Sequence, residues 1–219
     1  MKAILAQVSF FEAHFRVHRT KCAALTYPIP LPTSVAGIFG ALCGWERRID
    51  GQPKEATEMF FGAKLVRHDG IIQEHMTYKE VPKKVRGVAP VTIVNEPVYV
   101  IAMAGEGIEM WHDSLAEGSF KYLPYGGQSW FFPKDITNVR INETVETNEI
   151  GNYAPKDIVK DVKVKGKVFL HLFPVVHNFS ADETFYFVEG NGTLVLNRNV
   201  RSVEGIGLYS LEHFKWMIG

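Results

Sequence analysis

The alternation of apolar and polar residues along the first 140 positions predicts four β-strands. Residues 3–11 and 62–68 are rich in β-branched and aromatic side chains, which is typical of strands. Residues 91–104 predict a longer third strand, in which Pro97 indicates a bulge or an edge position. Residues 136–141 predict the fourth strand.

A helix is predicted directly after the segment 27–32, because its prolines keep the preceding residues out of the α region. Thr33 or Ser34 is placed to cap the start of this helix. A second, shorter helix is predicted over residues 108–115, ending near Gly118. The first helix has one apolar side and one side of very small residues: Val35, Ile38, Phe39 and Leu42 on the former, and Gly37, Gly40, Ala41 and Gly44 on the latter.

The small-residue side needs a physical reason, because each interior glycine costs about 1 kcal/mol relative to alanine. One reason is the close approach of another backbone, from this chain, from a partner subunit or from a nucleic acid. The other is structural, with Gly44 as the C-cap and with Gly37 and Gly40 packed on a sheet of the same domain. The spacing alone leaves both readings open.

The order of these elements, β-α-β-β-α-β, predicts an α+β chain with a ferredoxin-like domain over residues 1–142. Within that domain, residues 69–90 form a long basic insertion that predicts a protruding β-hairpin. Residues 143–219 are expected to form a smaller, mostly-β region. Asn191-Gly192 is predicted to be a hairpin turn inside that region.

Composition and charge exclude several classes of protein. With 24 basic and 24 acidic residues the formal net charge is zero, so the chain is not a generic nucleic-acid binder of high pI. Basic residues nevertheless cluster at 14–21 and 79–86, a pattern that fits either a solvated loop or a binding loop. No apolar run reaches the roughly 18 residues of a membrane span, so a cytoplasmic protein without membrane contact is expected.

Neither a cofactor nor a metal is expected. The two Gly-x-Gly pairs, at 105–107 and 190–192, lack the third glycine of a phosphate-binding loop. His14 and His18 lie four residues apart without an evident third ligand for zinc. Cys22 and Cys43 are too few for a thiolate site and are expected to be reduced.

Metal-independent RNA cleavage is a chemistry that the residue types allow. It needs a base for the 2′-hydroxyl, an acid for the leaving oxygen and a cation for the phosphorane. His14, Tyr27 and Lys21 are candidates for these groups. The sequence does not show that they converge.

The loop at residues 122–130 has a composition that suits a base-binding surface. Gly126 and Gly127 allow positive φ, and Tyr125 and Trp130 offer ring faces on which a base could stack. Aromatic residues beside a glycine turn also commonly cover the end of a core, so the structural reading stays open.

Four segments occur in a fixed order: Ala13-His-Phe-Arg16, residues 27–37, Asn95-Glu-Pro-Val-Tyr-Val100 and Pro124-Tyr-Gly-Gly-Gln128. Together they resemble the Cas-five family of CRISPR-associated RAMP proteins over about residues 1–140. Members of this family sit at one end of the type I surveillance complex, Cascade. They hold the 5′ handle of the CRISPR RNA and contact the first backbone subunit and the large subunit. The resemblance implies the same partners here, in antiviral defence, with target DNA reached only through the complex.

The resemblance also implies a set of RNA-binding residues. Residues 69–90 would be the family's thumb hairpin, cations would meet phosphates, the helix start would approach the handle, and aromatic rings would stack on bases. The implied residues are Arg16, Arg19, Lys21, Tyr27, Thr33, Ser34, Gly37, Lys79, Lys83, Lys84, Arg86, Tyr125, Gly126, Gly127, Gln128 and Trp130.

One branch of the family, in type I-C systems, cuts the CRISPR precursor with a tyrosine and an adjacent Lys-His pair. This sequence contains no Lys-His dipeptide. That departure favours a non-catalytic subunit, with cleavage left to a separate processing protein. The alternative is a metal-independent endoribonuclease that processes the precursor through His14, Lys21 and Tyr27.

Overall fold

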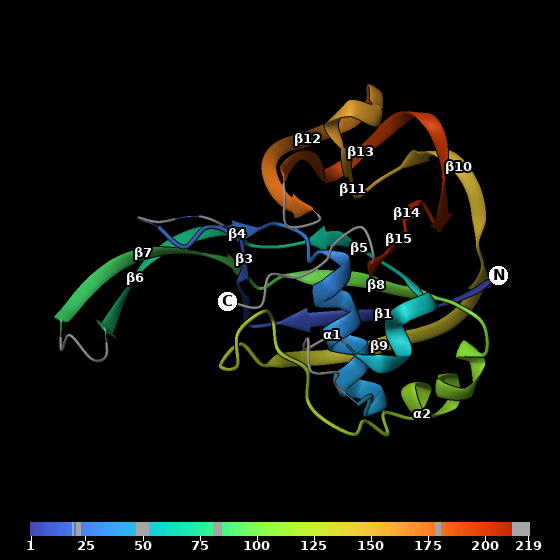
Figure 1. The fold of residues 1–219 in the computed structure, drawn as a ribbon, viewed down its shortest axis with the longest axis horizontal. Helices are drawn as coiled ribbons and strands as arrows, with labels where there is room; N and C mark the ends of the chain where they lie inside the picture. Colours follow the sequence, from blue (N-terminus) through green and yellow to red (C-terminus); the bar gives the residue numbers. More distant parts are fainter. Residues whose placement is uncertain (19, 21–22, 47–52, 81–84, 178–180, 212–219) are drawn as a thin grey trace.

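The structure is a computed structural model that describes residues 1–18, 20, 23–46, 53–80, 85–177 and 181–211. This part of the chain is mostly β-strand and has two α-helices. Its strands form a five-stranded sheet, a second sheet built around one long strand, and two smaller groups (Figure 1). Among the described residues, no helix is both long and apolar enough to cross a membrane.

The first sheet is antiparallel, with the order β15-β5-β8-β1-β9. Its central strands β1 and β8 are buried because both faces of the sheet are covered. Helix α1 lies on one face, and residues 203–208 lie on the other. The strands are β1 (Lys2–Phe10), β5 (Phe60–Arg67), β8 (Val98–Ala104), β9 (Pro133–Glu143) and β15 (Tyr209–Ser210).

Helix α1 (Pro32–Cys43) begins at a proline. Leu31 is the extended N-cap and no side chain caps the helix, so the predicted capping by Thr33 or Ser34 is wrong. Proline suits the first helical position because its missing N–H would have no acceptor inside the helix. The predicted C-cap is confirmed, since Gly44 is left-handed with φ 75°.

The two interior glycines of α1 differ in their surroundings. A Cβ on Gly40 would lie 3.3 Å from Pro53 Cγ and 3.4 Å from Trp45 Cε3, so Gly40 packs within this chain. A Cβ on Gly37 would meet no atom within 4 Å. The described part of the chain therefore leaves open the space in front of Gly37.

The predicted third strand is two strands, because the chain turns at Glu96 and Pro97. Glu96 has φ 48°, and the Pro97 carbonyl accepts a hydrogen bond from Phe10 N–H at 3.0 Å. Before the turn, β7 (Val85–Asn95) pairs with β6 (Gly70–Glu80) as an antiparallel hairpin over the insertion. Figure 1 shows this hairpin extending away from the sheet.

The predicted second helix is shorter than expected. Residues 108–115 form the 3-10 turn η2 (Ile108–Trp111), followed by α2 (His112–Ala116). Ile108 of η2 and Leu115 of α2 are buried and belong to the same core as the apolar side of α1. Another 3-10 turn, η1 (Lys54–Glu58), precedes β5.

The second sheet is organised by β13 (Ala181–Val203). The register places β12 (Val159–His177) and β14 (Ile206–Gly207) along one side of β13. Strands β10 (Val145–Ile150) and β11 (Tyr153–Pro155) lie along the other side, and the turn η3 (Lys156–Ile158) links β11 to β12.

The hairpin turn predicted at Asn191-Gly192 is wrong, because both residues lie inside β13. Strand β12 bulges opposite them, between Val164 and Val168. A Cβ on Gly192 would lie 2.6 Å from Val188 Cγ1 and 2.8 Å from Val168 Cγ1. Glycine therefore makes room for a close strand contact at this position, not for a reversal of the chain.

A cluster of aromatic rings joins the two sheets. Tyr27 stacks on Phe187 with centroids 5.4 Å apart and meets Phe173 edge-on at 5.6 Å. The ring of Tyr153 links the sheets, with its centroid 5.4 Å from that of Phe187 in β13 and 5.7 Å from that of Tyr209 in β15. One continuous core thus includes residues from both sides of the boundary predicted near residue 142, and the boundary itself stays a prediction.

Candidate nucleic-acid interface

The root of the β6–β7 hairpin is held by two neighbouring segments of the chain. Strand β2 (Glu12–Ala13) pairs with β7 at Asn95 and Val94. Ala24 continues along the same edge, donating its N–H to the Pro90 carbonyl at 2.8 Å. The backbone of this edge of β7 is therefore paired, which fixes the direction in which the hairpin leaves the body.

Thr92 of β7 binds both of those segments. The Nδ1–H of His14 donates to the Thr92 carbonyl at 2.8 Å, and the Thr26 N–H donates to Thr92 Oγ1 at 2.8 Å. The two segments also pair with one another as β3 (Phe15–Arg16) and β4 (Thr26–Tyr27). Two of the segments that carried the family resemblance are thus tied to the hairpin.

The glycine loop docks on the same place. Its Gly126 carbonyl accepts the His14 N–H at 2.8 Å, and its Gly126 N–H donates to the Phe131 carbonyl at 2.7 Å. Gly127 has φ 97°, and a Cβ there would lie 2.0 Å from the His14 carbonyl oxygen. Only glycine fits at this contact.

The turn after the hairpin completes the assembly. The Glu96 N–H donates to the Phe11 carbonyl at 2.9 Å, next to the Phe10–Pro97 bond. The segments that begin at residues 13, 27, 95 and 124 therefore meet at the hairpin root, although more than 100 residues separate the first from the last. We call this region the hairpin-root site.

His14 has a structural place in the hairpin-root site. Its side chain is fully buried, and its Nε2 atom has no hydrogen-bond partner among the described residues. Burial lowers the pKa of His14, with a further lowering by nearby Arg16, against a raising effect of the Thr92 hydrogen bond. His14 is therefore a neutral, enclosed side chain at neutral pH and has no access to a substrate.

The structure corrects the prediction that Tyr27 contacts RNA. Tyr27 is 1% exposed, and its hydroxyl donates to the Pro174 carbonyl at 2.7 Å. The ring is enclosed in the aromatic cluster, stacked on Phe187 and edge-on to Phe173, so it is not accessible to a base. The apolar neighbours that hold it, Phe173 and Phe187, are remote in sequence and could not be anticipated.

Other predicted residues of the glycine loop do face the surface. Tyr125 is 47% exposed and Trp130 is 53% exposed. Gln128 is half-buried, and its Oε1 atom has no hydrogen-bond partner among the described residues. Arg16, at the end of β3, is also exposed. Tyr125, Trp130 and Arg16 are therefore accessible to a ligand, whereas the Gln128 Oε1 atom is buried.

Three further residues beside the loop were missed in the sequence. Phe11 and Phe132 are about half exposed, and Phe132 meets Tyr125 edge-on at 5.8 Å. Lys134 lies over the Phe11 ring at 5.2 Å and pairs with Glu96 at 2.6 Å. Phe11 follows the last buried position of a strand and Phe132 precedes another strand, so their place at strand ends was the signal that could have found them.

The start of α1 is only partly exposed, and its predicted contacts with RNA stay a prediction. Thr33 is only 9% exposed, whereas Ser34 and Gly37 are half-buried. Gly37 has the most open surroundings of the three, as its missing Cβ would touch nothing.

Several predicted cations cannot be placed. Arg19, Lys21, Lys83 and Lys84 lie outside the described residues. Lys79 and Arg86 pair in register across the hairpin, but their side chains are not among those described. The predicted phosphate contacts of all six therefore stay predictions.

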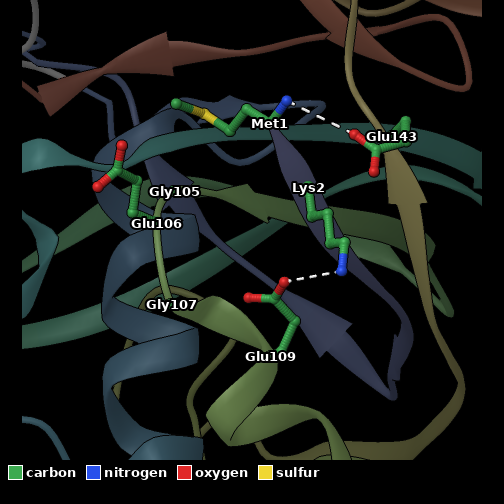
Figure 2. A pocket seen from close by; sticks show the side chains of 7 residues that line it. All are labelled: Met1, Lys2, Gly105, Glu106, Gly107, Glu109 and Glu143. Carbon is green, nitrogen blue, oxygen red and sulfur yellow. Dashed lines mark ion pairs between the residues drawn. The ribbon is translucent and has the colours of Figure 1, made fainter.

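The opposite end of β1 has a different character. A surface pocket of about 480 Å³ lies there. Figure 2 shows its lining residues Glu106, Glu109 and Glu143, together with Lys2 and the N-terminus. Lys2 pairs with Glu109 at 3.0 Å, and the terminal amine pairs with Glu143 at 3.5 Å. The surplus of carboxylates makes this pocket unsuited to a nucleic acid. Within the described ranges, no group of three or more His, Cys, Asp or Glu is arranged to hold a metal ion.

No protein-family model matches the chain, and its sequence has no significant match among curated proteins. Its fold does match solved structures. A chain described as "CRISPR RNA-guided surveillance complex" matches with a TM-score of 0.53 and 15% identity, over 89% of this chain and 91% of that one. A CRISPR protein from Archaeoglobus fulgidus matches with a TM-score of 0.51 and 12% identity, over 96% and 100% of the two chains.

At these identities the likeness concerns the fold. The structure thus agrees with the resemblance that the four segments indicated, because its structural neighbours are CRISPR-associated proteins.

Proposed function

We propose that this chain is an RNA-binding subunit of a type I CRISPR surveillance complex that grips the 5′ handle of the CRISPR RNA. The observation that carries the proposal is the hairpin-root site, where the four segments resembling the Cas-five family meet. The likeness to a chain of a CRISPR RNA-guided surveillance complex supports the class of assembly. The proposed partners are the RNA handle, the backbone subunit and the large subunit, with target DNA reached through the complex.

We interpret the first sheet as ferredoxin-like with a thumb insertion. Its elements follow the chain as β1, α1, β5, β8, α2 and β9, and its strands lie in the order β5-β8-β1-β9. The β6–β7 hairpin interrupts this series between β5 and β8, as the thumb does in the family. Residues 143–219 would then be a second, mostly-β region packed on that domain.

The exposed side chains suit single-stranded RNA. Tyr125 and Trp130 are about half exposed beside the docked glycine loop, and each ring contacts a neighbouring ring, Phe132 and Phe131 respectively. Stacking of a base on such a ring is worth about 1–3 kcal/mol. Arg16 and the hairpin cations would neutralise phosphates and hold the handle in register.

We propose binding without catalysis. General acid–base cleavage requires side chains within hydrogen-bond reach of the substrate. His14 is fully buried, and the Tyr27 hydroxyl is engaged by Pro174, which speaks against the nuclease alternative. Purified protein incubated with labelled repeat RNA in EDTA should give no site-specific product. A product that disappears in His14→Ala would establish the alternative.

The binding proposal is tested by removing one ring at a time. Fluorescence anisotropy with a labelled handle RNA should show Trp130→Ala and Tyr125→Ala each weakening binding by about 5- to 150-fold, because each variant loses the stacking of one base. Met110→Ala is the matched control, because Met110 is 73% exposed and lies in η2, away from the hairpin-root site. Equal affinities for all three variants would overturn the proposal.

The thumb assignment has its own test. In the triple variant Lys83→Ala, Lys84→Ala and Arg86→Ala, the slope of log affinity against log salt should fall by about 0.7 for each phosphate that the hairpin no longer neutralises. If the slope is unchanged while Trp130→Ala and Tyr125→Ala still weaken binding, the hairpin does not contact the RNA and only the glycine loop does.

A further inference from the structure

The outer edge of strand β12 over residues 168–172 is paired with none of the strands that the structure describes. Its inner edge pairs with β13 without a register shift from Val168 to His177. Among the described residues, no other strand pairs with β12. Figure 1 shows β12 along the outer side of the second sheet.

Two hydrogen bonds show which backbone groups of β12 point outward. Val188 of β13 lies opposite Leu170, but its N–H donates to the Asn152 carbonyl at 2.7 Å, on the far side of β13. The Leu170–Val188 pair is therefore not hydrogen-bonded across the strands, and Leu170 directs its N–H and carbonyl away from β13. Pro174 agrees with this alternation, because its carbonyl accepts the Tyr27 hydroxyl from outside the sheet.

Because the register has no shift from Val168 to His177, the outward direction found for Leu170 holds for every second residue of β12. Val168, Leu170 and Leu172 present their backbone groups outward, whereas Phe169 and His171 present theirs to β13. The side chains add an apolar surface beside that edge, since Leu170 is 40% exposed and Leu172 is 51% exposed.

The ends of this open edge are protected in ways typical of natural edge strands. On one side, β12 bulges between Val164 and Val168, beside the exposed lysines 163, 165 and 167. On the other, Pro174 lacks an N–H, and its carbonyl is occupied by Tyr27. Between them, residues 168–172 contain no Lys, Arg, Asp or Glu, no proline and no bulge. Natural proteins rarely leave such an edge bare.

We propose that residues 168–172 bind a short extended segment of a partner protein, which adds a strand to β12. About five residues fit between the bulge and Pro174, with apolar side chains at alternate positions to cover Leu170 and Leu172. The lysines beyond the bulge select acidic residues in the flanking part of that segment. Lys165 carries this selection best, because Lys163 already pairs with Glu149 and Lys167 lies over Phe169. None of the residues of this surface belongs to the proposed RNA site.

The test uses the whole chain and one designed peptide. The probe is a fluorescein-labelled peptide of ten residues. Its first six residues alternate valine and threonine, and its last four, at the C-terminus, are aspartates. An antiparallel strand would bring those aspartates to residues 163–167. The control peptide ends in four lysines instead. Binding is measured by anisotropy, and amide hydrogen exchange of the protein is measured by NMR.

The exchange pattern has an internal control within β12. In the free protein the Leu170 and Leu172 amides should exchange at least tenfold faster than the Phe169 and His171 amides, which bond to β13. The acidic peptide should protect Leu170 and Leu172 and leave the other two unchanged. Slow exchange of Leu170 and Leu172 in the free protein would overturn the proposal.

Two variants test the edge and the charge separately. Leu172→Lys, at an exposed position, should abolish peptide binding while the unfolding curve stays cooperative. Lys165→Glu with Lys167→Glu should weaken the acidic peptide about three- to tenfold and favour the basic one. Equal binding of both peptides to the unmodified chain would refute the charge selection. Dimerisation of the chain that Leu172→Lys removes would assign the edge to a second copy and overturn the proposal.

Discussion

Gly127 offers the sharpest test of how the hairpin-root site is built. Its φ of 97° is strained for any other residue, and a Cβ would lie 2.0 Å from the His14 carbonyl oxygen. The clash involves backbone on both sides, so no side-chain rotation relieves it. Gly127→Ala must therefore either strain this approach or lift the loop from β2 and β3.

The structure gives the size of the effect. A left-handed alanine costs about 1–2 kcal/mol. Lifting the loop also removes the hydrogen bond from His14 N–H to the Gly126 carbonyl, which is worth about 1 kcal/mol. The free energy of unfolding should therefore fall by about 2–3 kcal/mol.

The assay is urea denaturation, with exchange of the His14 amide as a local readout. Gly118→Ala is the matched control, because Gly118 has φ 73° but a Cβ there would meet nothing within 4 Å. It should lose only the backbone contribution of about 1–2 kcal/mol. The reasoning is refuted if Gly127→Ala costs no more than Gly118→Ala and leaves the His14 amide equally protected.

Three other outcomes follow from the contacts described. Tyr27→Phe loses the hydrogen bond to the Pro174 carbonyl, so the free energy of unfolding in urea should fall by about 1 kcal/mol while the affinity for handle RNA stays unchanged. A large loss of affinity would show that Tyr27 does contact the RNA. Burial tends to raise the pKa of Glu189, but hydrogen bonds from His68 and His171 bring it below its ordinary 4.5. The contribution of the Glu189 carboxylate to the free energy of unfolding is complete above about pH 4.5 and is lost as the pH falls through the native pKa. In Glu189→Gln the free energy of unfolding should therefore fall less steeply with pH below pH 4.5. Parallel curves for the two proteins would contradict this. Gly37→Leu should fold normally but impair assembly or handle binding, whereas Gly40→Leu should destabilise the chain against Pro53, and circular dichroism melts distinguish the two.

The local elements of the first 140 residues were largely accessible from the sequence. Apolar alternation located β1, β5 and β9, and the prolines located the start of α1 to within a residue or two. The errors fell where two constraints competed. Pro97 predicts a bulge or an edge position within one strand, but the left-handed Glu96 beside it turns the chain from the hairpin into the sheet. Asn191-Gly192 has the composition of a turn, yet the bulge of β12 uses its glycine for packing.

The candidate site divides in the same way. The sequence singled out the glycine loop and its exposed rings, because glycine at positive φ and unburied aromatics are local properties. The sequence could not show that Tyr125 and Trp130 are exposed and Tyr27 is buried, since all three are aromatic residues beside prolines or glycines. Their difference lies in contacts with Pro174, Phe173 and Phe187, which are about 150 residues away from Tyr27.

The sequence by itself thus determined the elements, the hairpin insertion and the four segments that resemble the Cas-five family, because these follow from short-range periodicity and backbone restriction. Only the tertiary structure decided that those segments meet at the root of the hairpin, that His14 and Tyr27 are buried, and that no described strand pairs with the outer edge of β12. Each of these depends on long-range strand pairing. The burial of a side chain and the direction of a backbone hydrogen bond are set by whichever distant strand packs alongside.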